Sequence, residues 1–266
     1  AIDGGYLVRY NYTSAPVKLT PDESEEWINI SKKIRQIYAR IKSSPKEMKN
    51  KLKNQFNTLC RERALIHKKA SKKVSKALSI IQENYNPNEG QRWLVYCQDT
   101  SQLESLGSEL SNINVTWTKY YSTLKKEQLK STKDRFETVG GLLLSIGCLD
   151  EGVDIPAADF ALIIASSSNP RQYIQRRGRV LRKDKLNPGK LANIFDLCIL
   201  PSSNYDGDKQ FAPMVESEIN RISEFAEHSN NSNFTLNFIE DKKIDYEISL
   251  DTSPNTSLID TEDDRG

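Results

Sequence analysis

An arginine-rich segment has residue types and a spacing suited to polyphosphate chemistry. Residues 171–182 read Arg-Gln-Tyr-Ile-Gln-Arg-Arg-Gly-Arg-Val-Leu-Arg. In a helix, Gln175, Arg179 and Arg182 stand at positions i, i+4 and i+7, so their side chains project from one face. A guanidinium is a rigid fork of donors that keeps its charge, which suits phosphate oxygens better than lysine does. The spacing alone also fits a solvated face or a nonspecific nucleic-acid contact.

A second segment, just upstream, combines glycines and carboxylates in one loop. Residues 142–156 begin as an apolar strand, continue as a loop and stop at Pro156. The loop contains Gly147, Asp150, Glu151, Gly152 and Asp154. Another apolar run follows at 160–165, so the loop joins two expected strands. These two segments together favour a ligand site.

The elements that must position these residues alternate between strands and helices. Strands are predicted at 92–97, 113–118, 141–146, 160–164 and 191–199, with helices at 100–110 and 124–137. This alternation predicts an α/β fold, a parallel sheet with helices on both faces. Ligands of such sheets bind beyond the carboxyl ends of the strands, where the loops at 97–100 and 145–156 emerge.

The first 90 residues predict short strands and then a long helical connector. One or two strands are expected within 6–20, and Thr20, followed by Pro21, predicts a helix start. That helix runs to about residue 41, before Ser44-Pro45. Apolar residues at steps of three and four over 46–85 predict one long amphipathic helix. Its other side is either a solvated face or a nucleic-acid contact, with lysines at Lys68, Lys69, Lys72, Lys73 and Lys76.

The chain divides into five expected regions. They are strands at 1–20, the helical connector at 21–90, the α/β domain at 91–212, a C-terminal helix and extension at 213–240, and an acidic, disordered tail at 241–266. The tail carries eight acidic and three basic residues. The rest of the chain therefore has a basic surplus, which suits a polyanionic partner.

Composition narrows the class of protein. The 266 residues are 37% hydrophobic and 28% charged, which predicts a soluble, cytoplasmic protein with a real core. No apolar run approaches the roughly 20 residues that span a bilayer, so no membrane partner is expected. The four cysteines form no Cys-x-x-Cys pair, so neither a metal site nor a disulfide framework is predicted. The start at Ala1 suggests a piece of a longer protein.

Taken together, the motifs resemble the C-terminal motor domain, a RecA-like domain, of superfamily 2 helicases and translocases. Residues 145–156 are similar to motif V of that family, 175–182 to motif VI and 92–100 to motif IV. Within the superfamily, residues 169–179, Asn-Pro-Arg-Gln-Tyr-Ile-Gln-Arg-Arg-Gly-Arg, most resemble prokaryotic restriction and phage-defence helicases and the excision-repair translocases. The resemblance implies an ATP hydrolase that acts on nucleic acid, DNA rather than RNA.

The resemblance also implies roles for residues that would contact the nucleotide. Arg179 and Arg182 correspond to fingers that reach ATP held on a partner domain, where an inserted arginine raises the rate by three to five orders of magnitude. Gln175 corresponds to a residue that bonds the phosphates or the catalytic water. Arg176 either ties the motif to neighbouring acids or forms a structural ion pair. Gly152 and Asp154 match positions near the ribose and the fingers, although Asp154 equally fits an orienting salt bridge.

A second set of residues is implied to contact the nucleic-acid backbone. Ser145 occupies the position of the family's hydroxyl residue, and Gly147 follows it; Gln98 and Thr100 are weaker candidates. Such contacts carry no base information, as a translocating motor requires. Asp99 departs from the family pattern, because a carboxylate repels phosphate. We interpret it as a helix cap, with Gln102 completing a capping box.

One departure from a complete motor is an absence. The sequence has no Gly-x-x-x-x-Gly-Lys-Ser/Thr loop to hold phosphates, and Asp150-Glu151 lies inside the motif V match rather than forming a separate magnesium-binding pair. The resemblance therefore implies half a motor, with ATP and Mg²⁺ bound mainly by an N-terminal RecA-like domain of the same protein and, as further partners, restriction or defence subunits. The alternative is a non-catalytic nucleic-acid-binding or regulatory module. No Asp/Glu-x-Lys cluster supports a nuclease.

Overall fold

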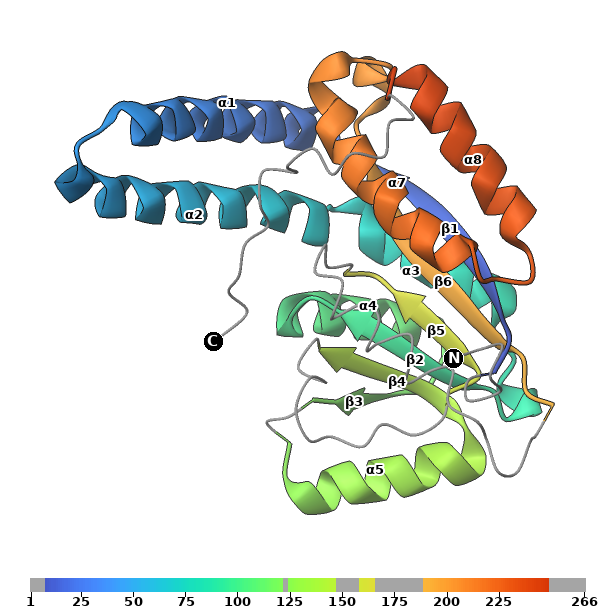
Figure 1. Cartoon of the computed structure of the whole chain (residues 1–266). Helices are drawn as coiled ribbons and strands as arrows, with labels where there is room; N and C mark the ends of the chain where they lie inside the picture. Colours follow the sequence, from blue (N-terminus) through green and yellow to red (C-terminus); the bar gives the residue numbers. More distant parts are fainter. Residues whose placement is uncertain (1–7, 122–123, 147–157, 166–188, 249–266) are drawn as a thin grey trace.

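The computed structural model describes residues 8–121, 124–146, 158–165 and 189–248 (Figure 1). Seven predicted site residues lie outside these ranges, namely Gly147, Gly152, Asp154, Gln175, Arg176, Arg179 and Arg182. Their roles therefore stay predictions. Among the described residues, no helix combines the length and apolar character needed to cross a membrane.

A six-stranded sheet forms the centre of the described structure. Its strands are β1 (Tyr10–Lys18), β2 (Arg92–Cys97), β3 (Trp117–Tyr120), β4 (Gly141–Ile146), β5 (Phe160–Ile163) and β6 (Ala192–Leu200). They lie in the order β1-β6-β5-β2-β4-β3, and every neighbouring pair is parallel. In the register, Val95 pairs with both Leu144 and Leu162. Strands buried on both faces have continuous apolar sequences, and β2 and β4 have this character.

Helices cover both faces of the sheet, which confirms the predicted fold class. The Tyr10 hydroxyl donates to the Phe225 carbonyl of α7 (Ala212–Ala226) at 2.7 Å. On the other face, Trp93 stacks on Phe195 with ring centroids 5.7 Å apart, and Tyr85 at the end of α3 (Lys72–Asn84) packs against Trp93 edge-on. Successive strand residues point to opposite faces, and Asp196, next to Phe195, contacts α7. Thus α3 and α7 lie on opposite faces.

Two further helices complete the wrapping of the sheet. The helix α4 (Thr100–Asn112) follows β2, and α5 (Lys126–Val139) follows β3. Right-handed crossovers in a parallel sheet place these two connections on opposite faces, because the chain moves outward from β2 to β3 and returns from β3 to β4. The predicted strand at 113–118 is wrong in its start: Ile113 caps α4 and Asn114 has φ of 59°, so the strand begins at Trp117.

A long helical hairpin extends away from the sheet (Figure 1). It consists of α1 (Pro21–Ser43) and α2 (Lys46–Lys68). Thr20 caps α1, as predicted, and it also forms a capping box with Glu23 that was not predicted. The break at Ser44-Pro45 is also confirmed, since Pro45 is the residue before α2.

The prediction of one continuous helix over 46–85 is wrong. The chain breaks between α2 and α3, where Ala70 is buried and the Ser71 amide donates to the Glu23 carboxylate at 2.8 Å. The apolar periodicity continues across the break because both helices bury a stripe, but against different partners. The stripe of α2 packs on α1, whereas that of α3 packs on the sheet. Periodicity alone does not distinguish these cases.

The two ends of the described chain meet at the edge strand β1. One strand, Tyr10–Lys18, forms where one or two were expected within 6–20, and it belongs to the same sheet as the later strands. The Asn231 side chain accepts from the Tyr12 amide at 2.7 Å and donates to the Tyr12 carbonyl at 2.9 Å, which occupies the open edge. The prediction of disorder from residue 241 is wrong for 241–245, because α8 (Ser232–Asp245) runs through them and buries Ile239.

Candidate functional site

The carboxyl ends of all six parallel strands meet at one edge of the sheet, and this edge is the candidate site. The described residues there include 98–100 after β2, Ser145 near the end of β4, and Ile164 and Ala165 after β5. Open α/β sheets bind ligands at this edge because loops from neighbouring strands converge on it. The motif segments 147–157 and 166–188 follow β4 and β5 directly, so the chain enters both from this edge.

Ser145 lies fully buried beneath this edge. Its hydroxyl donates to the Val95 carbonyl of the neighbouring strand at 3.2 Å, and the residue exposes 0% of its surface. Its predicted contact with a nucleic-acid backbone stays a prediction. In the described conformation the Ser145 hydroxyl is hydrogen-bonded within the sheet, so a contact with nucleic acid requires the hydroxyl to break its bond to Val95.

The loop after β2 is held by a helix cap and an ion pair. The Asp99 carboxylate accepts from the Gln102 amide at 3.0 Å, which confirms the predicted cap of α4. Lys69, at the end of α2, lies 2.5 Å from the same carboxylate. Burial opposes ionisation, but the hydrogen bond from Lys69 lowers the pKa of Asp99 below its usual range. Asp99 is therefore a charged anchor between the connector and the sheet.

The predicted capping box at this position is wrong in its second half. The side-chain oxygen of Gln102 accepts from the Gln98 backbone amide at 2.8 Å, rather than from the Asp99 backbone amide. The side-chain nitrogen of Gln102 donates to the Lys68 carbonyl at 3.0 Å. Gln102 thus joins the loop after β2 to the end of α2. Of the two weaker nucleic-acid candidates, Gln98 is half-buried and Thr100 is exposed.

Lys73 is a buried charge, although the sequence placed it on the lysine-bearing side of the connector, as part of a solvated face or a nucleic-acid contact. It exposes 2% of its surface, and its ammonium donates to the Ile164 carbonyl at 2.7 Å, at the carboxyl end of β5. The positions Lys73, Ala77, Ile80 and Ile81 share one face of α3. This buried face is visible in the spacing of α3 taken alone. The assumption of one continuous helix over 46–85 assigned the wrong residues to the buried side.

Burial lowers the pKa of Lys73 to about 8, which predicts a pH dependence of stability. Between pH 8 and the ordinary value near 10.5, the unfolded chain binds more protons, so the free energy of unfolding rises with pH. Relative to Lys73→Met, wild-type stability should increase over this range by about 2 to 3 kcal/mol. Urea unfolding of both proteins from pH 7.5 to pH 10 measures the difference, and parallel curves would contradict the prediction.

A second buried charge cluster joins α7 to β6. The Arg221 guanidinium contacts Asp196 and lies 2.7 Å from Glu218, and the Tyr12 hydroxyl donates to Asp196 at 2.9 Å. Glu218 also accepts from the Ile199 amide at 3.1 Å. Burial raises the pKa of Glu218, but the charge and hydrogen bond of Arg221, together with the charges of His67 and Lys73, outweigh burial and hold the pKa of this carboxyl below its usual range. The spacing of Glu218 and Arg221 was visible in the sequence, but Asp196 lies in an apolar strand, and nothing local links it to them.

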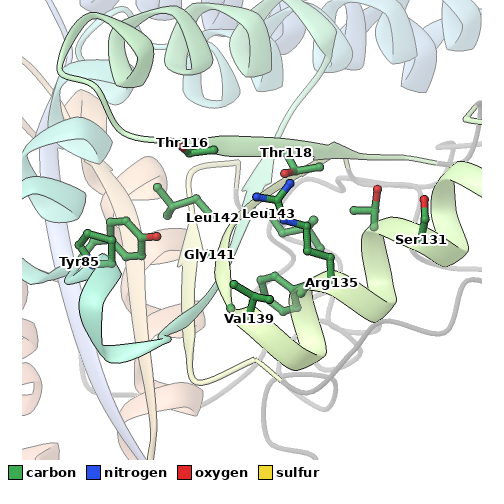
Figure 2. Close-up of a pocket in the computed structure, with 13 residues that line it drawn as sticks. Tyr85, Thr116, Thr118, Ser131, Arg135, Val139, Gly141, Leu142 and Leu143 are labelled. Carbon is green, nitrogen blue, oxygen red and sulfur yellow. The ribbon is translucent and has the colours of Figure 1, made fainter.

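One cavity in the described structure lies at the opposite edge of the sheet. It has a volume of about 330 Å³ and lies between α5 and the starts of β3 and β4. Figure 2 shows Arg135 reaching from α5 toward Thr118, with Tyr85 at the far side. Its other lining residues include Ser131, Thr132, Gly140, Gly141 and Leu143. Because this is the amino-terminal edge of the strands, the cavity is separate from the candidate site.

No cluster of three or more His, Cys, Asp or Glu residues that could hold a metal ion occurs among the described residues. Cys60, Cys97 and Cys198 are buried, and none of the three forms a disulfide within the described part of the chain. Burial raises the pKa of the Cys97 thiol to about 12, so this group stays protonated at neutral pH.

One protein-family model matches the part of the chain that forms much of this edge. Residues 72–184 match the family described as "Helicase conserved C-terminal domain". The match spans β2 to β5 and both motif segments. It agrees with the predicted resemblance to superfamily 2 motors, whereas the likeness to restriction and defence helicases stays a prediction.

Two curated relatives are named as a translocase and a helicase. A DNA 3'-5' translocase XPB2 of Sulfurisphaera tokodaii is 26% identical over 196 residues, which cover 68% of this chain and 42% of the relative. A putative ATP-dependent RNA helicase of Methanocaldococcus jannaschii is 23% identical over 118 residues, covering 41% and 15%. The chain thus spans less than half the length of these relatives.

Solved structures support the fold. The SWI2/SNF2 ATPase core of Sulfolobus solfataricus in complex with dsDNA superposes with a TM-score of 0.55 at 14% identity, over 91% of this chain and 51% of that one. The same core without DNA superposes with a TM-score of 0.51 at 14% identity, over 90% and 49%. At this identity the likeness establishes the RecA-like arrangement of the sheet and helices.

Proposed function

We propose that the helicase conserved C-terminal domain in this chain is the second half of an ATP-dependent helicase or translocase. The observation that carries the proposal is the family match over 72–184. The match includes the arginine-rich segment 171–182 and the loop of glycines and carboxylates within 142–156, and the strands between and before them belong to a parallel sheet of the RecA-like kind. The sequence has no phosphate-holding loop, and the relatives are more than twice as long as the matched part. ATP and Mg²⁺ would therefore be bound mainly by an N-terminal motor domain of the same protein.

In this function the arginine segment completes the nucleotide pocket. Arg179 and Arg182 would stabilise charge that develops on the transferred phosphoryl group, and Gln175 would bond its oxygens or the attacking water. Gly152 and Asp154 would lie near the ribose and the fingers, with Arg176 tying the segment to neighbouring acids. The support is positional: the two segments follow β4 and β5 at the edge where α/β sheets bind ligands.

Contact with nucleic acid would use the same edge. Gln98 and Thr100 would contribute from the loop after β2 and Gly147 from the segment that follows β4 in the sequence, and Ser145 would contribute only after releasing Val95. We favour DNA because one relative is named a DNA translocase and one similar structure was solved with dsDNA, although another relative is named an RNA helicase. The 169–179 motif further favours a cytoplasmic role in restriction or phage defence, with subunits of such a system as partners.

The proposal is tested by ATP turnover of the intact protein with single-stranded DNA, duplex DNA and RNA in turn. We expect DNA to stimulate turnover at least about tenfold, and we expect the 266-residue chain alone to show none above background. Hydrolysis by the chain alone would overturn the half-motor proposal. Stimulation by RNA only would overturn the choice of DNA.

The second candidate is a non-catalytic module that uses the fold to bind nucleic acid. The missing phosphate loop favours it, because this chain has no phosphate-binding motif of that kind. The same assay separates the two functions: an intact protein that binds DNA but never hydrolyses ATP would support the module.

A further inference from the structure

The outer part of the helical hairpin carries an unusual concentration of positive charge. We define the outer arm as residues 29–53, the second half of α1, the turn and the start of α2. It contains a single acidic residue, Glu47. Its nine basic residues are Lys32, Lys33, Arg35, Arg40, Lys42, Lys46, Lys49, Lys51 and Lys53. Because the whole chain has a net charge of only +2, the arm is a strongly basic extension of an otherwise acidic molecule.

The hairpin uses its apolar residues internally, which leaves the basic ones facing outward. Ile30 and Ile34 of α1 pack with Phe56 and Cys60 of α2 in a small core of their own. At 100° per residue, Lys32 and Arg35 lie on the side of α1 opposite this stripe, and the other basic positions of this helix lie along its flanks. Eight of the nine basic residues are exposed, and Lys49 is half-buried. Within the outer arm, Met48 is the one large apolar side chain that is exposed.

The root of the hairpin is fastened to the same sheet edge as the candidate site. The helix α1 begins directly after the carboxyl end of β1, and its Trp27 stacks on Phe211 with centroids 5.0 Å apart. The Ser24 hydroxyl accepts from the Ser202 amide, which follows β6, at 3.0 Å. At the end of α2, Lys69 pairs with Asp99. The arm therefore extends from the edge where ligand loops emerge (Figure 1).

We propose that the outer arm binds the phosphate backbone of duplex DNA outside the motor cleft. This inference rests on the proposed function, because it takes DNA as the polymer held at the sheet edge. The part of α1 in the arm, residues 29–43, is roughly 22 Å long, about two-thirds of a turn of B-form DNA, over which phosphates occur about every 1.7 Å of axis. Lysine and arginine contacts of this kind carry no base specificity. The arm would lengthen the footprint without selecting a sequence.

The chemistry of the arm favours nucleic acid over a membrane surface. Helices that lie in a bilayer interface insert an exposed apolar face. Here the apolar faces of α1 and α2 pack against each other, and the exposed side chains are predominantly cationic or polar. Anionic lipid therefore serves as a control surface in the test.

The test compares two triple variants that remove equal charge from the 266-residue chain. The first replaces Lys33, Arg35 and Lys53 of the arm with glutamine, and the control replaces Lys126, Lys130 and Arg135 of α5, which are also exposed. Fluorescence anisotropy with a labelled duplex of about 30 base pairs is measured between about 50 and 200 mM salt, without nucleotide. We expect the arm variant to bind at least about tenfold more weakly, with a salt slope lower by roughly 2 to 3. The control should change less than about threefold.

Each result either supports or overturns the arm proposal. Equal weakening in both variants would show a nonspecific charge effect and overturn it, as would unchanged binding in the arm variant or no duplex binding by the wild-type chain. Loss of binding to anionic phosphatidylserine vesicles with intact DNA binding would assign the arm to a membrane instead. The ATP turnover of the intact protein is measured separately, so stimulated turnover with unchanged arm-variant binding would reject the arm while leaving the proposed function in place.

Discussion

Replacing Arg179 with alanine in the intact protein is expected to reduce DNA-stimulated ATP turnover by at least about a thousandfold. The reason is that an arginine placed at the transferred phosphoryl group contributes three to five orders of magnitude in rate. ATP binding should change little, because the resemblance assigns the phosphates and Mg²⁺ mainly to the N-terminal domain. Steady-state hydrolysis and equilibrium binding of a fluorescent ATP analogue measure the two effects independently.

A matched control for this variant is available two residues away. Arg177→Ala removes the same charge from the same segment, but in a helix Arg177 faces away from the side shared by Gln175, Arg179 and Arg182. We expect its turnover to stay within about threefold of wild type. If Arg177→Ala and Arg179→Ala lose turnover equally, the segment acts through its overall charge or its folding, and the finger assignment is wrong.

The sheet could be predicted from sequence because its strands have simple local signals. The predicted strand at 92–97 matches β2 residue for residue, and 141–146 matches β4, since buried parallel strands are short apolar runs bounded by polar turns. Thr20 and Asp99 were predicted as helix caps for a similar reason. A cap depends on one side chain and the amides that follow it.

The errors occurred where a pattern depends on a distant partner. The apolar stripe over 46–85 belongs to two helices, because Glu23 holds the Ser71 amide at the break, and no residue near 71 indicates that contact. The same error placed Lys73 on the outward, lysine-bearing side of the helix rather than on its buried side. Gln102 bonds Lys68 and Gln98 rather than completing a box, since the end of α2 lies beside α4 only in the folded chain. Local spacing contains no information about these neighbours.

For the candidate site, the sequence predicts the chemistry and the structure supplies the framework. Spacing suggested phosphate recognition by Gln175, Arg179 and Arg182, and the resemblance gave these residues their roles. The family match over 72–184 includes them. The sheet edge explains how two segments on either side of β5 in the sequence can contribute to one ligand site, because β4 and β5 both flank β2 and end together. What spacing did not reveal is that the Ser145 hydroxyl is already bonded within the sheet.

The second large effect is expected from Arg221→Met, which should lower the free energy of unfolding by about 3 to 5 kcal/mol. The guanidinium is almost fully buried and contacts both Asp196 and Glu218. Methionine fills much of the volume but leaves two buried carboxylates without their nearest countercharge, and this poorly compensated charge is the main cost. Urea unfolding at pH 7.5 measures the loss. The control Lys119→Met breaks the exposed pair with Glu104, which solvent screens, and should cost only a small fraction of that loss.

The pH dependence of this loss distinguishes electrostatics from packing. In the wild type, Arg221 holds the pKa of Glu218 below its ordinary value near 4.5, so the stability that this pair contributes is present at neutral pH and is lost as the pH falls through the folded-state pKa. In the variant, burial without the guanidinium raises the pKa of Glu218, and protonation relieves the buried charge. Both effects bring the two proteins together as the pH falls from 7.5 toward 4. A difference that stays constant over this range would mean that Arg221 stabilises α7 against the sheet by packing rather than by charge.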